Sequence, residues 1–208
     1  MISSYGELNE KHLDVLSELG NIGAGNAATS LSAMIDGEVG VSVPSVKILS
    51  YEEAIRSVGD PESLGLAVMI RYSGEVQGIM LFLLEYEDAK GIAERMMEEA
   101  GKSDNSVGLS DMKISTIMEI GNILGSSYLG SISALTGLDL AVSVPYICID
   151  MIGAIMSAPM LEYSVDNSRI LLVDEGVSID ESCLMSHVIL LADIPSLNKI
   201  LSRLGIDG

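Results

Sequence analysis

Positive charge is scarce in this chain of 208 residues, and the scarcity excludes several classes of partner. Lysine and arginine together number 11 against 30 aspartates and glutamates, which gives a formal net charge of −19 at pH 7. Clustered Lys and Arg side chains bind nucleic-acid phosphates, so the composition excludes a nucleic-acid-binding protein. The same shortage disfavours binding to an anionic membrane surface, because basic side chains supply that attraction.

Cysteine and histidine are also in short supply. The two cysteines, Cys148 and Cys183, stand among apolar neighbours, which predicts buried free thiols rather than a disulfide framework. The two histidines, His12 and His187, are too few and too scattered for a metal site, and we expect them in the core or on the surface. No Ser-His-Asp or Cys-His triad can be argued from the sequence.

Apolar runs long enough to cross a bilayer are missing from the sequence. The stretch from Leu184 to Ile194 is among the longest, and His187 and Asp193 interrupt it. The N-terminus lacks the basic residues and the apolar stretch of a signal peptide. We therefore expect a cytoplasmic protein without membrane insertion, and without a metal or cofactor of its own.

The chain does contain an internal repeat. Four residues of the first half recur in the second half at a constant displacement of 101 residues: Asp14, Glu18, Asn21 and Pro44 return as Ser115, Glu119, Asn122 and Pro145. The block Val-Ser-Val-Pro also returns unchanged, at 41–44 and 142–145. A register shared by the polar positions and the segment that follows them indicates duplication rather than chance. Two copies imply two equivalent working surfaces.

Both copies lie in long stretches with helical periodicity. Apolar residues recur at three- and four-residue spacing, at Leu13, Leu16, Ala27, Leu31 and Met34 in one copy and at Ile114, Ile117, Leu124, Ile132 and Leu135 in the other. At 3.6 residues per turn, motif positions i, i+4 and i+7 stack along one narrow face, away from the apolar stripe. One exposed Glu or Asn is ordinary, but the repetition of both makes this face the candidate site.

A glycine precedes the asparagine of each copy. Gly20 and Gly121 each cost about 1 kcal/mol relative to alanine in a helix interior, so we expect that the missing side chain has a purpose. Two explanations remain open, namely close packing on a neighbouring element and close approach of a partner. The run of Gly20, Gly23 and Gly25 is not a phosphate-binding loop, because neither the dinucleotide fingerprint after a strand nor a Gly-Lys-Ser/Thr sequence is present.

With these residues the chain resembles the CheC family of chemotaxis phosphatases, relatives of CheX and of the phosphatase part of FliY. The family motif is Asp or Ser, three residues, Glu, two residues, Asn, then twenty-two residues and Pro. Residues 14–44 and 115–145 both fit it without departure. The resemblance covers nearly the whole chain, and two motif copies are typical of CheC, whereas CheX-like proteins usually keep one.

The resemblance implies that the chain hydrolyses the aspartyl-phosphate of the response regulator CheY and so terminates a chemotactic signal. Mg²⁺ is expected in the acidic pocket of phosphorylated CheY, and the phosphatase needs only to position a water for in-line attack. By the resemblance, Asn21 and Asn122 orient that water, since an amide offers both a donor and an acceptor. Glu18 and Glu119 are expected to pair with the active-site Lys of the regulator, and neither is needed as a general base.

Four further motif residues are expected to be supporting rather than catalytic. Asp14 and Ser115 flank the polar face, and Pro44 and Pro145 shape the segment beside it. Each proline adjoins a β-branched Val-Ser-Val run, which confines it to a strand edge or a strand end.

The main alternative is an adaptor with little catalysis. Members of the family also bind CheD, the receptor deamidase, so the chain could couple phosphorylated CheY to CheD. The candidate docking surface is a helix over 152–160 with methionines at Met151, Met156 and Met160. A flagellar switch component is disfavoured because no FliN-like sequence follows Gly208. Retention of both acid–amide pairs favours the phosphatase, since a pure adaptor has no need of them.

The expected fold class is α+β, with two αβαββα repeats related by a pseudo-two-fold axis and an antiparallel-rich sheet under the motif helices. After each motif helix the sequence predicts a strand, a short helix, two strands and a closing helix, over 39–49, 52–58, 65–71, 76–85 and 88–99, and again over 141–149, 152–160, 170–175, 185–192 and 195–204.

One compact domain is expected over residues 1–208, made of halves 8–100 and 109–208 that are joined by a linker over 101–108. A monomer is favoured. We expect the motif faces to be convex and exposed, without a deep pocket, which suits a protein substrate better than a small metabolite.

Overall fold

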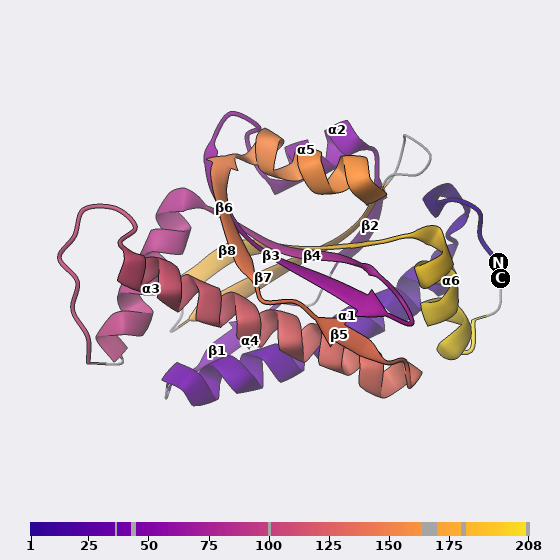
Figure 1. The fold of residues 1–208 in the computed structure, drawn as a ribbon, viewed down its shortest axis with the longest axis horizontal. Coiled ribbons are helices and arrows are strands. Elements are labelled where there is room, and N and C mark those ends of the chain that lie inside the picture. Colours follow the sequence, from indigo (N-terminus) through magenta and orange to yellow (C-terminus); the bar gives the residue numbers. More distant parts are fainter. Residues whose placement is uncertain (36, 43–44, 100, 164–169, 180–181, 207–208) are drawn as a thin grey trace.

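A computed structural model describes residues 1–35, 37–42, 45–99, 101–163, 170–179 and 182–206. A sheet lies between a layer containing α2 and α5 and a layer containing α1 and α4 (Figure 1). In chain order the elements are η1 (Tyr5–Glu7), α1 (Glu10–Ile35), β1 (Val39–Val41), β2 (Ser45–Leu49), α2 (Tyr51–Val58), β3 (Leu64–Gly74), β4 (Gly78–Glu85), α3 (Tyr86–Glu99), α4 (Asp111–Thr136), β5 (Leu140–Val142), β6 (Tyr146–Met151), α5 (Ile152–Tyr163), β7 (Ile170–Ile179), β8 (Ser182–Ala192) and α6 (Ile194–Arg203).

This is a mixed α and β fold with an antiparallel sheet, as the sequence predicted. Two single strands predicted over 39–49 and 141–149 were wrong, since each is a pair of strands, β1 with β2 and β5 with β6. Between β5 and β6 stands Pro145, which lacks the N–H that a sheet ladder requires. Pro44 lies outside the described residues.

Strands of the two halves are interleaved within one sheet. Its order is β1-β7-β8-β4-β3-β5, with β2 also paired to β7 and β6 also paired to β3. The first-half strands β1 and β2 therefore pair with a second-half strand, and β5 and β6 pair with a first-half strand. The equivalent strands of the two halves are β1 and β5, β3 and β7, and β4 and β8. Each strand stands at the same distance from one edge of the sheet as its equivalent stands from the other edge. This order agrees with the predicted pseudo-two-fold axis, which stays a prediction.

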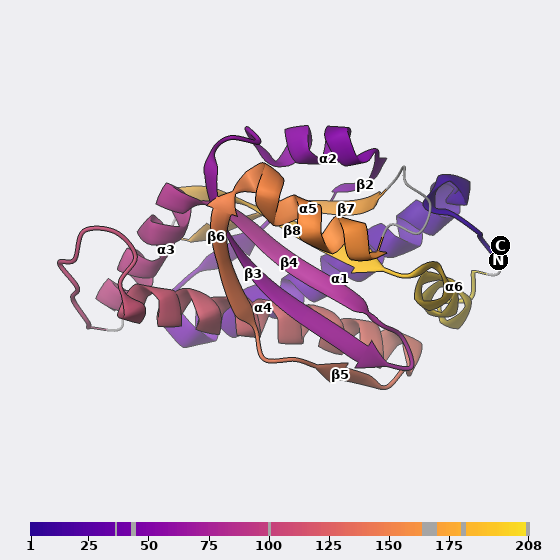
Figure 2. The same ribbon diagram turned by 45° about the horizontal axis from the view of Figure 1, so that its top comes forward.

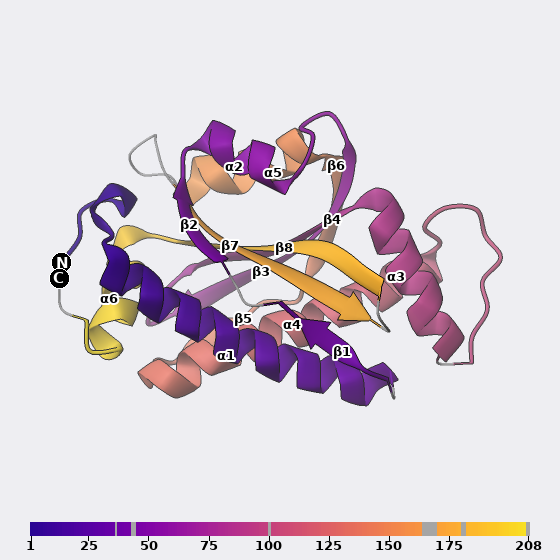
Figure 3. The same ribbon diagram turned by 180° about the vertical axis from the view of Figure 1, so that it is seen from behind.

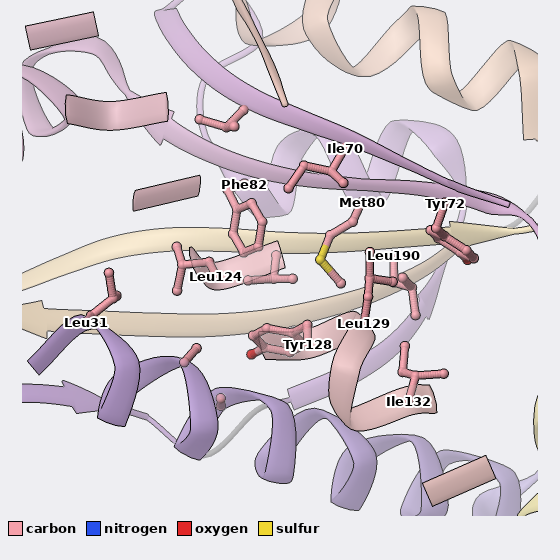
Figure 4. Packing of buried hydrophobic residues seen from close by; sticks show 14 of the residues in the cluster. Leu31, Ile70, Tyr72, Met80, Phe82, Leu124, Tyr128, Leu129, Ile132 and Leu190 are labelled. Carbon is pink, nitrogen blue, oxygen red and sulfur yellow. The ribbon is translucent and has the colours of Figure 1, made fainter. Parts of the chain in front are cut away.

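The larger core cluster lies between the sheet and the α1/α4 layer (Figure 4). The rings of Phe82 on β4 and Tyr128 on α4 meet edge to face, with their centroids 6.4 Å apart. Such aromatic pairs add roughly 0.5–1.5 kcal/mol beyond the apolar area they bury. They join α4 to the centre of the sheet.

A second cluster lies on the opposite face, between the sheet and α2 and α5, which sit next to each other in Figure 2. Met156 and Met160 belong to this cluster and are only 1% and 2% exposed. The predicted methionine docking surface was therefore wrong, because the apolar side of α5 covers the sheet. Met151 alone of the three is exposed.

Helices α1 and α4 run antiparallel and pack directly on each other (Figure 3). Their polar contacts are Asn26 Nδ2 to Ser131 Oγ at 2.9 Å and Ser127 Oγ to Ser30 Oγ at 3.4 Å. The displacement of 101 residues converts the first residue pair into the second, so the two copies exchange roles across this interface. The two motifs therefore lie toward opposite ends of the helix pair.

Candidate functional site

The first motif stands on an open face of α1. Asp14, Glu18 and Asn21 are all exposed, while Leu16 and Leu19 of the same turns are buried. The helical periodicity therefore placed the polar face correctly, but Met34 at the end of the expected apolar stripe is exposed. In the second copy, Ser115 and Glu119 are exposed on α4, and Asn122 is half-buried.

The acids and amides of the motifs have no side-chain partner among the described residues. Within the described part of the chain, no hydrogen bond or ion pair engages the side chains of Glu18, Asn21, Glu119 or Asn122. Ser115 differs, because its hydroxyl donates to the carbonyl oxygen of Asp111 at 2.7 Å within the same helix. Each acid–amide pair is thus available to a partner, whereas the Ser115 hydroxyl is partly satisfied.

The two motifs are not brought together. The antiparallel contacts of Asn26 with Ser131 and of Ser127 with Ser30 place the middle of the interface near residues 28 and 129. Each asparagine lies about seven residues before the midpoint on its own helix, and the helices are antiparallel. Asn21 and Asn122 are therefore roughly 20 Å apart along the helix pair. The structure therefore holds two separate candidate sites.

The second motif lines a groove. About 530 Å³ of space lies between α4 and the β5–β6 connection, bounded by Ser115, Met118, Glu119, Asn122, Ser126, Val142, Ser143, Val144 and Pro145. The expected convex surface was wrong here, because pairing of β5 and β6 with β3 brings their connection alongside α4. Pro145 itself is buried at the groove wall. The supporting segment and the polar helix face thus form one surface.

Close packing explains the glycine before Asn122. A Cβ atom on Gly121 would overlap Val68 Cγ1 on β3 and would lie 2.8 Å from Val68 Cβ. One turn later a Cβ on Gly125 would overlap Ile70 Cδ1. The missing side chains let α4 lie directly on β3, which fixes the height of Asn122 above the sheet. Of the two explanations left open by the sequence, the packing one accounts for Gly121.

A buried lysine at the start of α4 is a feature that the sequence analysis missed. Lys113 is fully buried, and its Nζ donates to Glu94 Oε1 at 2.7 Å and to the carbonyl oxygens of Ser106 and Gly108 at 3.0 and 3.1 Å. The hydrogen bond from Lys113 lowers the pKa of the Glu94 carboxyl. The signal in the sequence was its position in the apolar stripe, four residues before Ile117.

The same region carries a second acidic contact. The Ser110 hydroxyl donates to Asp104, and Ser106 donates its backbone N–H to Asp104 Oδ1 at 2.9 Å. These hydrogen bonds lower the pKa of Asp104 to about 2. Residues 104–110 are thereby held against the start of α4, just before the motif that begins at Ser115.

The position equivalent to Lys113 in the first copy is His12, which is also buried. The imidazole Nδ1 of His12 accepts from the backbone N–H of Asn9 at 3.0 Å, and the backbone N–H of His12 donates to Asn9 Oδ1 at 3.2 Å. His12 therefore closes the N-terminus of α1, and His187 is buried on β8. Both histidines thus lie in the core, which is one of the two positions expected for them.

Other chemistry is limited in the described residues. No cluster of three His, Cys, Asp or Glu side chains there is arranged to hold a metal, and none of the helices described is both long and apolar enough to span a bilayer. Cys148 is a free, half-buried thiol whose pKa is raised by burial. The side chain of Cys183 lies outside the described part.

Known proteins resemble this chain over its whole length. The CheC-like family model matches residues 12–48 and 112–149, which contain both motif helices. The CheY-P phosphatase CheC of Bacillus subtilis (strain 168) is 30% identical over 207 residues, which cover 98% of this chain and 99% of that protein. The flagellar motor switch phosphatase FliY of the same organism is 28% identical over 145 residues, which cover 69% of this chain and 37% of FliY.

A solved structure extends the comparison to the fold. The crystal structure of FliY from Thermotoga maritima superposes with a TM-score of 0.78 at 20% identity, covering 96% of this chain and 98% of that one. At this identity the likeness concerns the fold alone. It shows that the overall fold of this chain is one known from a solved structure.

Proposed function

The chain belongs to the CheC-like family, and on that premise we propose that it hydrolyses the aspartyl-phosphate of the response regulator CheY. The observation that carries the proposal is the pair of unpartnered acid–amide sets on two exposed helix faces. Single exposed polar side chains are ordinary, but the recurrence of the same acid and amide in one register on both helices favours a role in binding. The name of the B. subtilis relative gives the substrate class.

The chemistry asked of this surface is modest. An acyl phosphate is already activated, and Mg²⁺ bound by phosphorylated CheY neutralises the charge on the transferring group. Asn21 and Asn122 are proposed to hold the attacking water, because an amide can accept a hydrogen bond from it and donate one to it at the same time. Orientation of this kind lowers the entropic part of the barrier.

Glu18 and Glu119 stand one turn before the asparagines on the same faces. We assign them to the active-site lysine of CheY, which sets the depth of docking. Asp14, Ser115, Pro44 and Pro145 support the two faces. The exchange of residue roles at the α1/α4 interface supports two sites that act independently.

The test is phosphate release from phosphorylated CheY with Mg²⁺ present. We expect Asn21→Ala and Asn122→Ala each to remove part of the acceleration and the double variant to remove nearly all of it. Asn105→Ala is the matched control, because Asn105 is an exposed amide on the connection between α3 and α4. A double variant as active as the unaltered chain would disprove water positioning by these residues.

The adaptor alternative is separated by the same assay. If the unaltered chain binds phosphorylated CheY but hydrolysis stays at the rate of CheY alone, a CheD-directed adaptor becomes the better proposal. The burial of Met156 and Met160 removes the surface on which that alternative relied.

A further inference from the structure

Exposed apolar side chains surround the second motif. Val144 is 82% exposed, Met112 is 48% exposed and Val142 is 41% exposed. Val142 and Val144 line the groove together with Met118, and Met112 lies seven residues before Glu119, which places both on one face of α4. A cluster of exposed apolar side chains beside unpartnered polar groups is typical of a protein interaction site.

These side chains contribute little to the core. Neither Met112 nor Val144 belongs to any buried apolar cluster of the described structure. An exposed side chain gains little stability from burial. Their position at the rim of the groove therefore points to contact with another molecule.

The first copy keeps the acid and the amide but changes the neighbouring helix residues. Lys11 and Ser17 occupy the positions equivalent to Met112 and Met118. Lys11 is exposed and Ser17 is half-buried. The copies thus share the residues proposed for chemistry and the Val-Ser-Val-Pro block, and they differ in the two helix residues beside the acid and the amide.

We propose that Met112, Met118 and Val144 are specificity-determining docking residues for the phosphorylated protein substrate at the second motif. This inference rests on the proposed function. The expected partner at the groove is a response regulator whose phosphorylation pocket is bordered by apolar side chains. Continuity with the groove of Glu119 and Asn122 identifies this occupant. Methionine suits the task because its flexible, polarisable side chain adapts to an irregular surface.

The kinetic test exchanges residues between the copies. In an Asn21→Ala background, where only the second site acts, we expect Met112→Lys with Met118→Ser to raise KM for phosphorylated CheY roughly tenfold. We expect kcat to change by less than about twofold, since uniform binding contributes to KM alone. Val144→Ser should also raise KM. Met118→Leu, which keeps an apolar side chain, should leave KM at its normal value.

The matched control is Leu161→Ser, because Leu161 is an apolar residue as exposed as Val144 and lies on α5, in the opposite helical layer. Thermal unfolding of each variant checks that the fold is retained. An unchanged KM in the folded double exchange would overturn the inference, as would an equal rise of KM in the Leu161 variant.

A binding measurement separates this inference from the proposed function. Calorimetric titration with beryllofluoride-loaded CheY, a stable mimic of the phosphorylated form, needs no turnover. A roughly tenfold weaker Kd for the double exchange supports the docking residues even if the unaltered chain fails to hydrolyse phosphate. An unchanged Kd, or no binding by the unaltered chain, rejects them whatever the hydrolysis assay shows.

Discussion

Helices α1 and α4 are equivalent in register but begin with different chemistry. At the start of α1, His12 and Asn9 exchange two short-range hydrogen bonds. At the same position of α4, Lys113 reaches Glu94 on α3 and two carbonyl oxygens of the preceding connection. One helix is closed locally and the other is fastened across sequence-distant elements. The two equivalent positions are therefore both buried but have different partners.

The largest effect is expected from Lys113→Met, which keeps the apolar stem and removes the charge. Glu94 and the carbonyls of Ser106 and Gly108 lose their donor, and a broken buried ion pair costs about 3–5 kcal/mol. The Glu94 side chain is 41% exposed and can turn to water, so we expect a loss of only about 2–3 kcal/mol. Urea unfolding measures this loss.

The matched change in the first copy is His12→Ala, which keeps the backbone N–H bond to Asn9 Oδ1 and removes the imidazole acceptor. We expect a cost of about 1–2 kcal/mol, because the Asn9 N–H loses its partner. A larger loss for His12→Ala than for Lys113→Met would contradict the contrast between a local cap and a long-range clamp. In the Lys113 variant, hydrogen exchange should rise first over residues 101–110, because their fastening is lost.

The next effect is expected from Gly121→Ala. The added methyl group would overlap Val68, and overpacking of a close contact costs about 1–3 kcal/mol. Higher helix propensity returns about 1 kcal/mol, which leaves a net loss of up to about 2 kcal/mol. Thermal unfolding reports this loss, and phosphatase activity should fall at the second site because α4 is lifted from β3. A variant that is more stable than the unaltered chain would disprove the packing explanation.

Gly25→Ala is expected to act in the opposite direction. No atom outside the local helix lies within 4 Å of a Cβ built at Gly25, so the methyl group meets open space. The helix then gains about 0.5–1 kcal/mol through reduced backbone entropy and better propensity. The pair of glycine variants thus separates a packing glycine on α4 from a replaceable one on α1. A loss of stability for Gly25→Ala would show that α1 needs that glycine for another reason.

Local patterns in the sequence predicted most of the elements and the two polar faces. Glu18 and Asn21 could be placed because helical periodicity alone sets which side chains share a face. The division of the strand around Pro145 and the groove beside Asn122 depend on pairing with β3, some 80 residues earlier, and the repeat spacing carries no information about it. Lys113 escaped prediction for the same reason, since its acceptors come from α3 and from an irregular connection.

The smallest expected effect concerns acid pH, and it again distinguishes the two helix starts. The pKa of Asp104 is lowered from 3.8 to about 2 by its hydrogen bonds with Ser110 and Ser106. A carboxyl with a lowered pKa stabilises the folded state above its ordinary pKa, and this stabilisation is lost as pH falls from about 4 to about 2. Asp104 is solvent-accessible, so the change is local and screened by salt.

The amide resonances of Ser106 and Lys113 should therefore move together between about pH 4 and about pH 2 in an NMR titration. Asp104→Asn should abolish this transition, because no carboxyl remains to be protonated there. The cap of α1 consists of Asn9 and His12 and contains no carboxylate, so the Asp104 variant should leave the resonances of α1 unchanged. A transition that persists in the Asp104 variant would assign the acid sensitivity of this connection to Glu94, whose pKa is lowered by Lys113.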